Sequence, residues 1–461
     1  MGTYNTATCR WVMGVLLGAA AFGPTVVLAQ AHDPGVRHAA TDGGPPPPLP
    51  GLTADEQTFF QDGVNRFETV EVVSGASGTQ GNGLGPTFNS NQCSSCHQQP
   101  FVGGSSPPSN PQVAVAHAAG ATNQVPWFVV SNGPVREARF KTSNGAPDGG
   151  VHALFTITGR TDAGSCTIAQ PSFTPAGNGV TGQGGNPNII FRIPTPTMGA
   201  GLIESINDST ILASAQATAG ARERMGIGGS ANRSGNDGTI TRFGWKAQNK
   251  SLLMFAGEAY NVEMGISNQL FQQERNETPS CQGGNSTPND TVNFSSAGAA
   301  VLSDIEAFAD FMRMLAPPTP ASATSSTEQG SALFASIGCS LCHTPTLTTG
   351  RAIGSGSATN PSAALSNKAA HLFSDMLVHH MGTGLSDGIS QGNAGPDQFR
   401  TAPLWGVGQR VYFLHDGRTN NIITAIMDHA SSGSEANAVV ENYEHLTTAQ
   451  QQALVNFLRS L

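Results

Sequence analysis

The sequence predicts a mainly α-helical protein built from two halves that share one plan. Two observations predict it: a helix-start signal precedes a Cys-x-x-Cys-His motif in each half, and an amphipathic helix closes each half. The halves meet near residues 317–325, so we expect one domain at 53–316 and another at 325–461. The first is about twice as long, and we assign the excess to Gly/Asn/Ser-rich loop insertions, chiefly at 140–240.

The first thirty-one residues have the features of an export signal. Arg10 is their only charge, an apolar run follows it, and Ala29-Gln30-Ala31 offers a small-x-small cleavage site. The run is nearly long enough to span a bilayer, so an uncleaved anchor is the alternative. Pro24 and the cleavage site favour removal. We therefore expect residues 1–31, with Cys9, to leave as a signal peptide, and the mature protein to be periplasmic or secreted without spanning a membrane.

A polar, Pro-rich stretch follows at 32–52, and its composition is typical of an extended linker rather than a packed element. Roughly 410 residues remain beyond it, enough for two domains with sizeable cores. The chain has 56 Gly and 29 Pro, and 11% of its residues are charged, so we expect long ordered loops on a modest helical frame. The net charge of -9 argues against a nucleic-acid partner and would suit a basic protein.

Helix starts can be placed from one local pattern. A Ser or Thr followed three residues later by Glu predicts a capping box, in which each side chain accepts a hydrogen bond from the backbone of the other residue. The pattern occurs at Thr53–Glu56, Ser303–Glu306 and Ser325–Glu328. The second of these helices must end before Pro317-Pro318.

Four of the six cysteines beyond the signal fall into the two Cys-x-x-Cys-His motifs. They are Cys93, Cys96 and His97 in the first half, and Cys339, Cys342 and His343 in the second. Two thiols one helical turn apart can add to the two vinyl groups of one haem, and the adjacent His can supply the proximal nitrogen. A pooled zinc site would join pairs far apart in sequence and leave both histidines unused, and a redox dithiol needs no such His. We predict two covalently bound c-type haems, one in each of two cytochrome c-like domains.

The remaining two cysteines are Cys166 and Cys281. In an oxidising compartment they could form a disulfide. Two buried free thiols are the alternative.

With these motifs in place, the chain resembles the bacterial di-haem cytochrome c peroxidase superfamily. It is most similar to the di-haem oxidoreductase branch, described as peroxidases or thiol oxidoreductases, from about residue 53 to the end. The most specific stretch, 399–429, resembles the segment through the peroxidases' Phe-His-Asp-Gly motif, here with Leu414 inserted before His415. The stretch 372–382 resembles their Phe-His-Asn-x-Gly loop, which implies that His379 lies beside the second haem.

The resemblance implies a departure at the second haem. The peroxidases have a distal Met fourteen residues after the His of their motif, and here that position is His429. A second imidazole usually leaves a haem potential lower than a thioether does, so a His/His haem suits the peroxidases' electron-entry role less well. Met427, Met381 and His380 are competing ligands. A His packed near a propionate is the alternative for His429.

By the same resemblance the first haem is the reactive one. Peroxide chemistry needs an open iron position and an acid-base group nearby. An ungapped match of residues 242–265 puts Glu263 on the peroxidases' distal acid, Leu253 on their distal glutamine, and Phe243 on their bridging tryptophan. Trp245 takes the position of the bridging tryptophan instead if the match is shifted by two residues in this loop. A buried Glu paired with an Arg is the alternative for Glu263.

Three further expectations follow from the resemblance. Trp245 and Trp405 are candidate electron relays between the haems, with simple packing as the alternative. His117 could ligate the first haem, although a surface or loop histidine is the favoured interpretation. Calcium is a further candidate cofactor, because peroxidases of this type hold it between their domains.

These residues predict an exported di-haem oxidoreductase that reduces hydrogen peroxide or another small oxidant at the first haem. Electrons would enter through the second haem from a small cytochrome c or a cupredoxin. One alternative is an enzyme that oxidises an organic or protein substrate. Another is a di-haem electron carrier with no substrate. A carrier predicts a second strong ligand over the first haem, whereas an enzyme predicts a pocket there.

Overall fold

The computed structural model describes residues 1–2, 30–40, 42–73, 83–157, 167–173, 188–275, 278, 289–351 and 362–461. Cys166, Cys281 and most of the predicted signal peptide lie outside these ranges, so the predicted disulfide stays a prediction. Within them, no helix is both long enough and apolar enough to cross a membrane.

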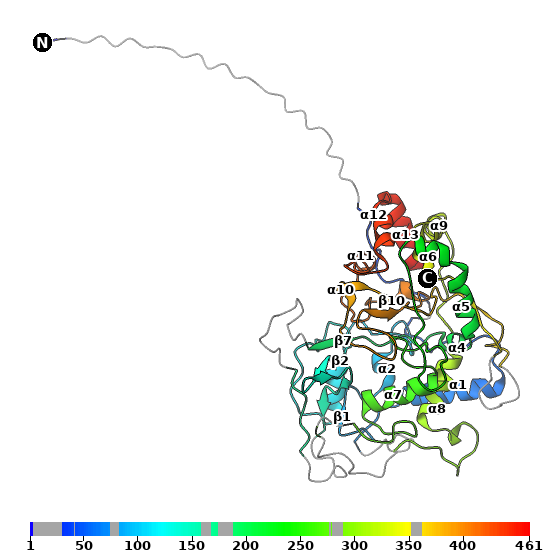
Figure 1. The fold of residues 1–461 in the computed structure, drawn as a ribbon. Helices are drawn as coiled ribbons and strands as arrows, with labels where there is room; N and C mark the ends of the chain where they lie inside the picture. Colours follow the sequence, from blue (N-terminus) through cyan, green and yellow to red (C-terminus); the bar gives the residue numbers. More distant parts are fainter. Residues whose placement is uncertain are drawn as a thin grey trace.

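Helices form the frame of both halves (Figure 1). In the first half they are α1 (Ala54–Phe67), α2 (Cys93–Cys96), α3 (Gln112–Ala118), α4 (Ala200–Glu204), α5 (Asp208–Ala217), α6 (Ala219–Arg224), α7 (Leu252–Met264), η2 (Gly298–Val301) and α8 (Asp304–Met314). In the second half they are α9 (Ser325–Ser336), η3 (Cys339–Leu341), α10 (Gly382–Leu385), η4 (Val407–Gln409), α11 (Ile422–Met427), α12 (Asn437–Glu444) and α13 (Thr448–Ser460).

Short strands, which the sequence did not predict, link these helices. They are β1 (Thr87–Phe88), β2 (Glu137–Phe140), β3 (Thr142–Ser143), β4 (Ala146–Pro147), β5 (Val151–His152), β6 (Phe155–Thr156), β7 (Ile189–Arg192), β8 (Leu347–Thr348), β9 (Ala369–Ala370), β10 (Val378–His380) and β11 (Gln398–Arg400). All described pairings are antiparallel, in the order β5-β2-β7 for the three-stranded sheet and β1-β6, β3-β4, β8-β9 and β10-β11 for the pairs. The fold is therefore helical with some strands.

The same close helix crossing occurs once in each half. Gly63 of α1 lies so near α8 that a Cβ atom there would come within 2.5 Å of the Ala307 carbonyl oxygen. Gly330 of α9 lies equally close to α13, where a Cβ would meet the Ala453 carbonyl oxygen at 2.0 Å. Only glycine permits either approach. The two halves thus repeat one packing device at equivalent positions.

Aromatic rings follow each crossing at the same spacing. Phe67, one turn after Gly63, packs against Phe311 at a ring-centroid distance of 4.9 Å. Phe334, one turn after Gly330, packs against Phe457 at 5.4 Å. Side chains one turn apart lie on the same helix face, so each Gly and its Phe meet the same partner helix.

The predicted helix starts agree with the structure at two of three positions. Capping boxes form at Thr53–Glu56 and Ser303–Glu306. The third prediction is wrong by one residue, because α9 is capped by Thr324, whose side chain and that of Thr327 form the box. Thr324 and Ser325 are both good caps, and the local pattern alone did not decide between them.

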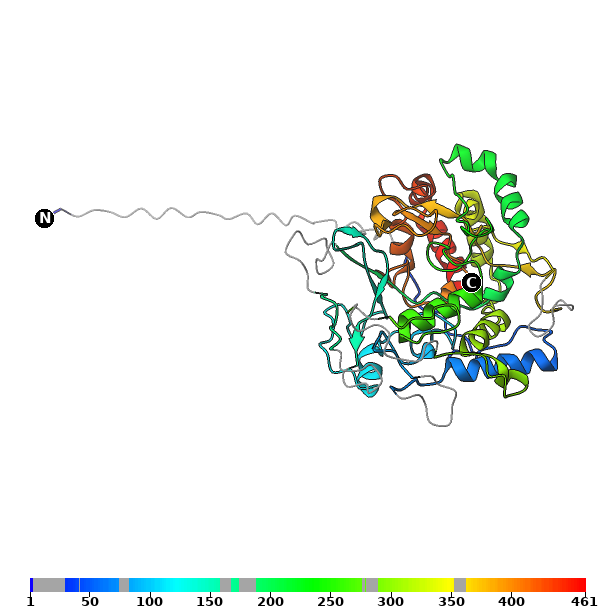
Figure 2. The ribbon, with the colours of Figure 1, turned by 60° about the horizontal axis from the view of Figure 1, so that its bottom comes forward.

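The two halves pack against each other more extensively than a domain boundary near 317–325 suggests. The main apolar core includes Leu347, Ala370 and Trp405 of the second half beside helices of the first. The helices α5 and α6 of the first half extend alongside the second half in both views (Figures 1 and 2).

Buried ion pairs also cross between the halves. They are Arg192–Asp387 at 2.6 Å, Lys246–Asp387 at 3.1 Å and Arg222–Asp375 at 2.6 Å. Loss of either partner would leave a charge buried without compensation, which is strongly unfavourable. The halves therefore hold each other at a fixed orientation.

The Pro-rich stretch 32–52 is extended, as predicted, but it is packed rather than a free linker, and this corrects the sequence-based expectation. Leu49 is buried and its N–H donates to the Met314 carbonyl at the end of α8. Asp33 accepts hydrogen bonds from the guanidinium of Arg459 in α13 at 2.7 and 2.6 Å, and from the N–H of Ile422 at the start of α11. Composition could not reveal these partners, because they lie about four hundred residues away along the chain.

Replacement of Asp33 by Asn should destabilise the protein measurably. The Arg459 side chain is 4% exposed, and an unpaired buried charge costs about 3 kcal/mol of unfolding free energy. Denaturant unfolding of the holoprotein, followed by circular dichroism, measures this loss. The matched control is Asp237→Asn, whose pair with Lys250 is 40% exposed on both sides and should leave the midpoint unchanged. Equal effects of the two changes would contradict the account.

Candidate functional site

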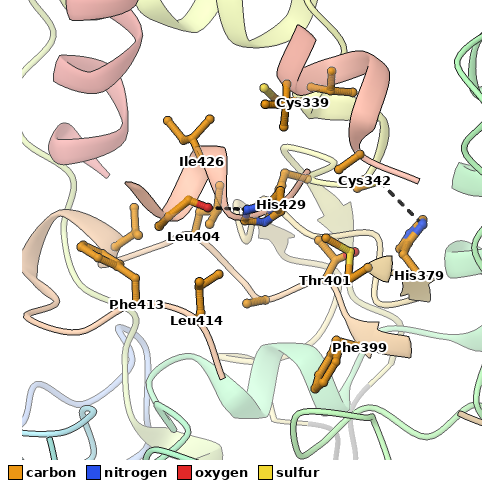
Figure 3. Close-up of a pocket in the computed structure, with 18 of the residues that line it drawn as sticks. Cys339, Cys342, His379, Phe399, Thr401, Leu404, Phe413, Leu414, Ile426 and His429 are labelled. Carbon is orange, nitrogen blue, oxygen red and sulfur yellow. Dashed lines mark hydrogen bonds between the residues drawn. The ribbon is translucent and has the colours of Figure 1, made fainter. Parts of the chain in front are cut away.

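The second Cys-x-x-Cys-His motif lies at one wall of an apolar cavity. Cys339, Cys342 and His343 line it together with His429, which follows α11 (Figure 3). Most of the remaining wall is apolar and includes Phe399, Leu404, Phe413, Leu414 and Ile426. The structure thus brings the motif and the predicted distal ligand into one cavity.

His343 and His429 are oriented in the same way. The Nδ1 atom of His343 lies 3.1 Å from the Phe373 carbonyl oxygen, and that of His429 lies 2.6 Å from the Ala425 carbonyl oxygen. A carbonyl oxygen can only accept, so each Nδ1 carries the proton and each Nε2 keeps a free lone pair. Burial lowers the pKa of His343 to about 4 and also lowers the pKa of His429, so both rings are neutral at pH 7. A neutral imidazole fixed at Nδ1 is the form that ligates a metal.

His379 and His415 also line this cavity, but neither resembles a ligand. Both nitrogens of His379 are engaged, Nδ1 with Glu435 at 2.6 Å and Nε2 with Asp375 at 2.9 Å. The ring of His415 stacks on Phe399 at a centroid distance of 4.3 Å. These two histidines are held as parts of the wall.

The competing ligands named from the sequence differ in whether they line this cavity. Met381 lines the cavity, whereas Met427 and His380 do not. His380 is 51% exposed and pairs with Asp397. Of the four candidates, His429 alone combines a place in the cavity with a free imidazole nitrogen.

The first motif lies at a separate cavity with a different wall. Cys93, Cys96 and His97 line it, and His97 is held by its Nδ1 atom at 3.1 Å from the Gly104 carbonyl oxygen. Phe67 packs edge-on against the His97 ring at 6.0 Å. Among the described residues, His97 is the only histidine lining this cavity, since His117 is exposed and lines neither cavity.

A pair of carboxyl groups lines the first cavity. Glu263 from α7 and Glu137 from β2 are hydrogen-bonded to each other, and the Asn89 side-chain amide donates to Glu263 Oε2 at 2.6 Å. Two facing carboxyl groups can form such a bond only if one is protonated. Burial and the charge of Glu137 raise the pKa of Glu263 to about 8. Glu263 is thus the member that holds the proton at pH 7.

Arginines stabilise the other member of the pair. Arg139 Nε donates to Glu137 Oε1 at 2.7 Å, and the Arg139 and Arg192 charges lower the pKa of Glu137 despite its burial. The pairing of Glu137 with Arg192 across β2 and β7 brings both residues to the cavity. The alternative for Glu263 was a direct ion pair with an arginine. Instead, Glu263 is hydrogen-bonded to Glu137, and Glu137 forms the ion pair with Arg139.

Trp245 lies in the wall between the two cavities and lines both of them. Its indole N–H donates to the Ile193 carbonyl oxygen at 3.0 Å, and its ring meets the His415 ring edge-on at 6.4 Å. Phe243, which the ungapped match favoured for this place, packs against Phe255 and lines neither cavity. Trp405 also lines neither and lies against Gly199.

The donor sets of both cavities fit a haem. Each offers two thiols one turn apart, a neutral imidazole held by a backbone carbonyl oxygen, and largely apolar or aromatic walls for a macrocycle. Burial raises the pKa of Cys96 to about 11 and that of Cys339 to about 12, so these sulfurs are neutral thiols at pH 7. Four thiolates gathered on one zinc ion are incompatible with two separate cavities.

Comparison with known proteins settles the family. A family model described as "Di-haem oxidoreductase, putative peroxidase" matches residues 180–461, more than half of the chain. The chain belongs to the di-haem oxidoreductase family. Membership of this family implies haem cofactors and an oxidoreductase function. No curated protein matches the chain.

Solved structures match parts of this di-haem oxidoreductase at low similarity. The diheme peroxidase BthA from Burkholderia thailandensis is 16% identical, with a TM-score of 0.27, over 48% of this chain and 65% of that one. A MauG-like protein associated with microbial copper homeostasis is 17% identical, with a TM-score of 0.23, over 35% and 53%. Hydrazine synthase of Kuenenia stuttgartiensis is 18% identical, with a TM-score of 0.23, over 34% and 55%. The chain thus spans less than two thirds of the length of each.

Sequence reasoning missed Glu137, Arg139 and Arg192. Each is an ordinary charged residue in a stretch without helical periodicity, and a Glu-x-Arg pair recurs by chance in many surface strands. The available signal was the alternation of β2, which turns Glu137 and Arg139 to one face.

Proposed function

We propose that this di-haem oxidoreductase is an exported c-type cytochrome that reduces hydrogen peroxide at the haem on His97. Electrons would reach that site through the haem on His343, supplied by a small cytochrome c or cupredoxin. Covalent attachment through Cys93, Cys96, Cys339 and Cys342 belongs to the same proposal.

The observation that carries it is the difference between the two cavities. The second offers two fixed imidazoles, His343 and His429, and both would be available to hold a haem there. The first offers one imidazole, His97, and a carboxyl pair. A carrier would need a second strong ligand in the first cavity, whereas an enzyme needs an open face beside an acid-base group.

A haem held by Cys93, Cys96 and His97 would supply one-electron redox chemistry. The protein's own task is to move a proton between the two peroxide oxygens. In the ionised state, Glu263 would accept a proton from one peroxide oxygen and then deliver it to the other. Glu137 stays ionised and paired with Arg139 throughout. Its negative charge raises the proton affinity of Glu263.

Trp245 supports an electron route between the sites because its ring belongs to both cavities. The indole is fixed by the Ile193 carbonyl, so its ring keeps one orientation. A fixed, buried aromatic ring shared by two cavities is well placed for electron transfer from one haem to the other.

Export, the donor protein and calcium remain parts of the proposal that rest on the sequence. In the described part of the chain, no group of three or more His, Cys, Asp or Glu side chains is arranged to hold a metal ion. Any calcium site formed by these described residues alone would have to draw chiefly on carbonyl oxygens and water.

Replacement of Glu263 by Gln tests the proposed reaction. Loss of a general acid-base group should lower kcat/KM for peroxide reduction by about 10²–10⁴-fold. Stopped-flow oxidation of a reduced donor cytochrome by peroxide measures it. In the wild type kcat/KM should rise with pH through about 8, where Glu263 ionises. Glu137→Gln removes a neighbouring negative charge, so this rise should move to lower pH.

The matched control is Glu258→Gln, which removes a negative charge from the same cavity and the same helix without touching the carboxyl pair. Its kcat/KM and pH profile should resemble those of the wild type. Wild-type turnover by Glu263→Gln would contradict the proposed role.

Replacement of Trp245 by Phe should slow electron transfer from the second haem to the first. The reason is that Phe keeps the packing of the wall but is much harder to oxidise than an indole. Stopped-flow absorbance after peroxide addition to the half-reduced protein follows this step. Trp405→Phe is the control, and an equal loss in both variants would argue against a specific route through Trp245.

A further inference from the structure

Tyr260 is a buried tyrosine in the wall of the first cavity that the proposed reaction does not use. It lies on α7, one turn before Glu263, with 2% of its surface exposed. Its hydroxyl contacts two carboxyl groups, Asp304 Oδ2 at 3.0 Å and Glu71 Oε1 at 3.2 Å. A phenol has one proton, so both contacts can be hydrogen bonds only if one carboxyl group is protonated and donates.

The surroundings of the two carboxyl groups decide which one donates. Asp304 is paired with Arg66 at 3.0 Å, which favours its ionised form. Glu71 has no cationic partner, its Oε2 has no hydrogen-bond partner among the described residues, and burial raises its pKa to about 7. An unpartnered carbonyl oxygen costs less than an unpartnered carboxylate oxygen. The direction is therefore Glu71 to Tyr260 to Asp304, with the phenol donating to Asp304.

Such an arrangement changes what the phenol can do. Oxidation of a phenol makes its O–H strongly acidic, and a buried radical cation is unfavourable unless the proton can leave. Asp304 lies within hydrogen-bond distance to accept that proton. Burial raises its pKa, so it binds a proton more readily than an exposed carboxylate does.

The second cavity supplies an internal comparison. Tyr443 lines that cavity and is 3% exposed, but its hydroxyl has no hydrogen-bond partner among the described residues. Burial raises its pKa to about 12. Tyr443 is therefore a buried tyrosine without a proton acceptor, and Tyr260 is a buried tyrosine with one.

We propose that Tyr260 is a redox-active residue that donates one electron to the peroxide-oxidised first site while its phenolic proton moves to Asp304. The Tyr260 O–H bond breaks and an Asp304 O–H bond forms, which leaves a neutral tyrosyl radical and a neutral carboxylic acid. Reduction of one peroxide to two waters consumes two electrons and two protons. Tyr260 supplies one of these electrons when the donor protein has delivered only one. The next donor electron reduces the radical, and Asp304 returns the proton.

This inference rests on the proposed peroxide reaction, because that reaction supplies the oxidant. The position of Tyr260 and its hydrogen bonds come from the structure. Tyr260 also packs edge-on against Phe308 at 5.1 Å, and Phe308 packs against Phe67, the ring beside His97. The phenol is thus held rigidly at the first cavity and away from the second.

The test is freeze-quench electron paramagnetic resonance of the one-electron-reduced holoprotein after addition of one equivalent of peroxide without further donor. We expect a tyrosyl radical signal in the wild type, identified by line narrowing when the tyrosines carry deuterium on Cβ. The signal should be lost in Tyr260→Phe and kept in Tyr443→Phe. An exchangeable proton coupling, present in H₂O and absent in D₂O, should report the hydrogen bonds that Glu71 and the protonated Asp304 donate to the radical oxygen.

A parallel sample separates this inference from the proposed function. Flash-quench oxidation with a ruthenium photosensitiser removes an electron without peroxide. A Tyr260 radical under photo-oxidation alone would support the inference and argue against peroxide as the substrate. A radical that survives in Tyr260→Phe would overturn the inference, as would the absence of any tyrosyl radical under both oxidants.

Discussion

Both cavities depend on one physical constraint, the glycine-permitted contact between two helices. The α1 and α8 backbones meet at Gly63, and those of α9 and α13 meet at Gly330. This contact fixes the Phe one turn later, Phe67 or Phe334, against the histidine of the Cys-x-x-Cys-His motif. The motif histidine is then held from its other side by a backbone carbonyl oxygen. Each half thus builds the same proximal wall by the same means.

The other walls of the two cavities differ, and the different roles proposed for the two sites rest on that difference. Around the second motif the chain supplies His429 and a largely apolar surface. Around the first it supplies β2, β7 and α7, whose charged side chains form the Glu137–Glu263 pair and its arginines. One plan therefore yields two unlike cavities, with Trp245 in the wall between them. Ion pairs across the halves, such as Arg192–Asp387, keep that wall in register.

The sequence predicted features that depend on neighbours within one turn, and missed those that depend on distant partners. Both motifs and two of the three capping boxes are local patterns, whereas the place of His429 at the second cavity was implied by the family resemblance. The contact of Asp33 with Arg459 and the pairing of Glu137 with Glu263 arise only after the chain has folded. Trp245, and not Phe243, lines both cavities, and it lies in a tight turn in which Gly244 and Ala247 have positive φ angles of 84° and 52°. Residue identity alone did not indicate that turn.

The central claim is that the two haem sites differ, with an open first site and a His/His second site. Low-temperature electron paramagnetic resonance of the ferric holoprotein, with two haems per chain verified, tests it most directly. The account predicts one high-spin signal beside one low-spin signal of the His/His type. Two low-spin signals, with a first site that stays six-coordinate after one-electron reduction, would contradict it and would favour an electron carrier.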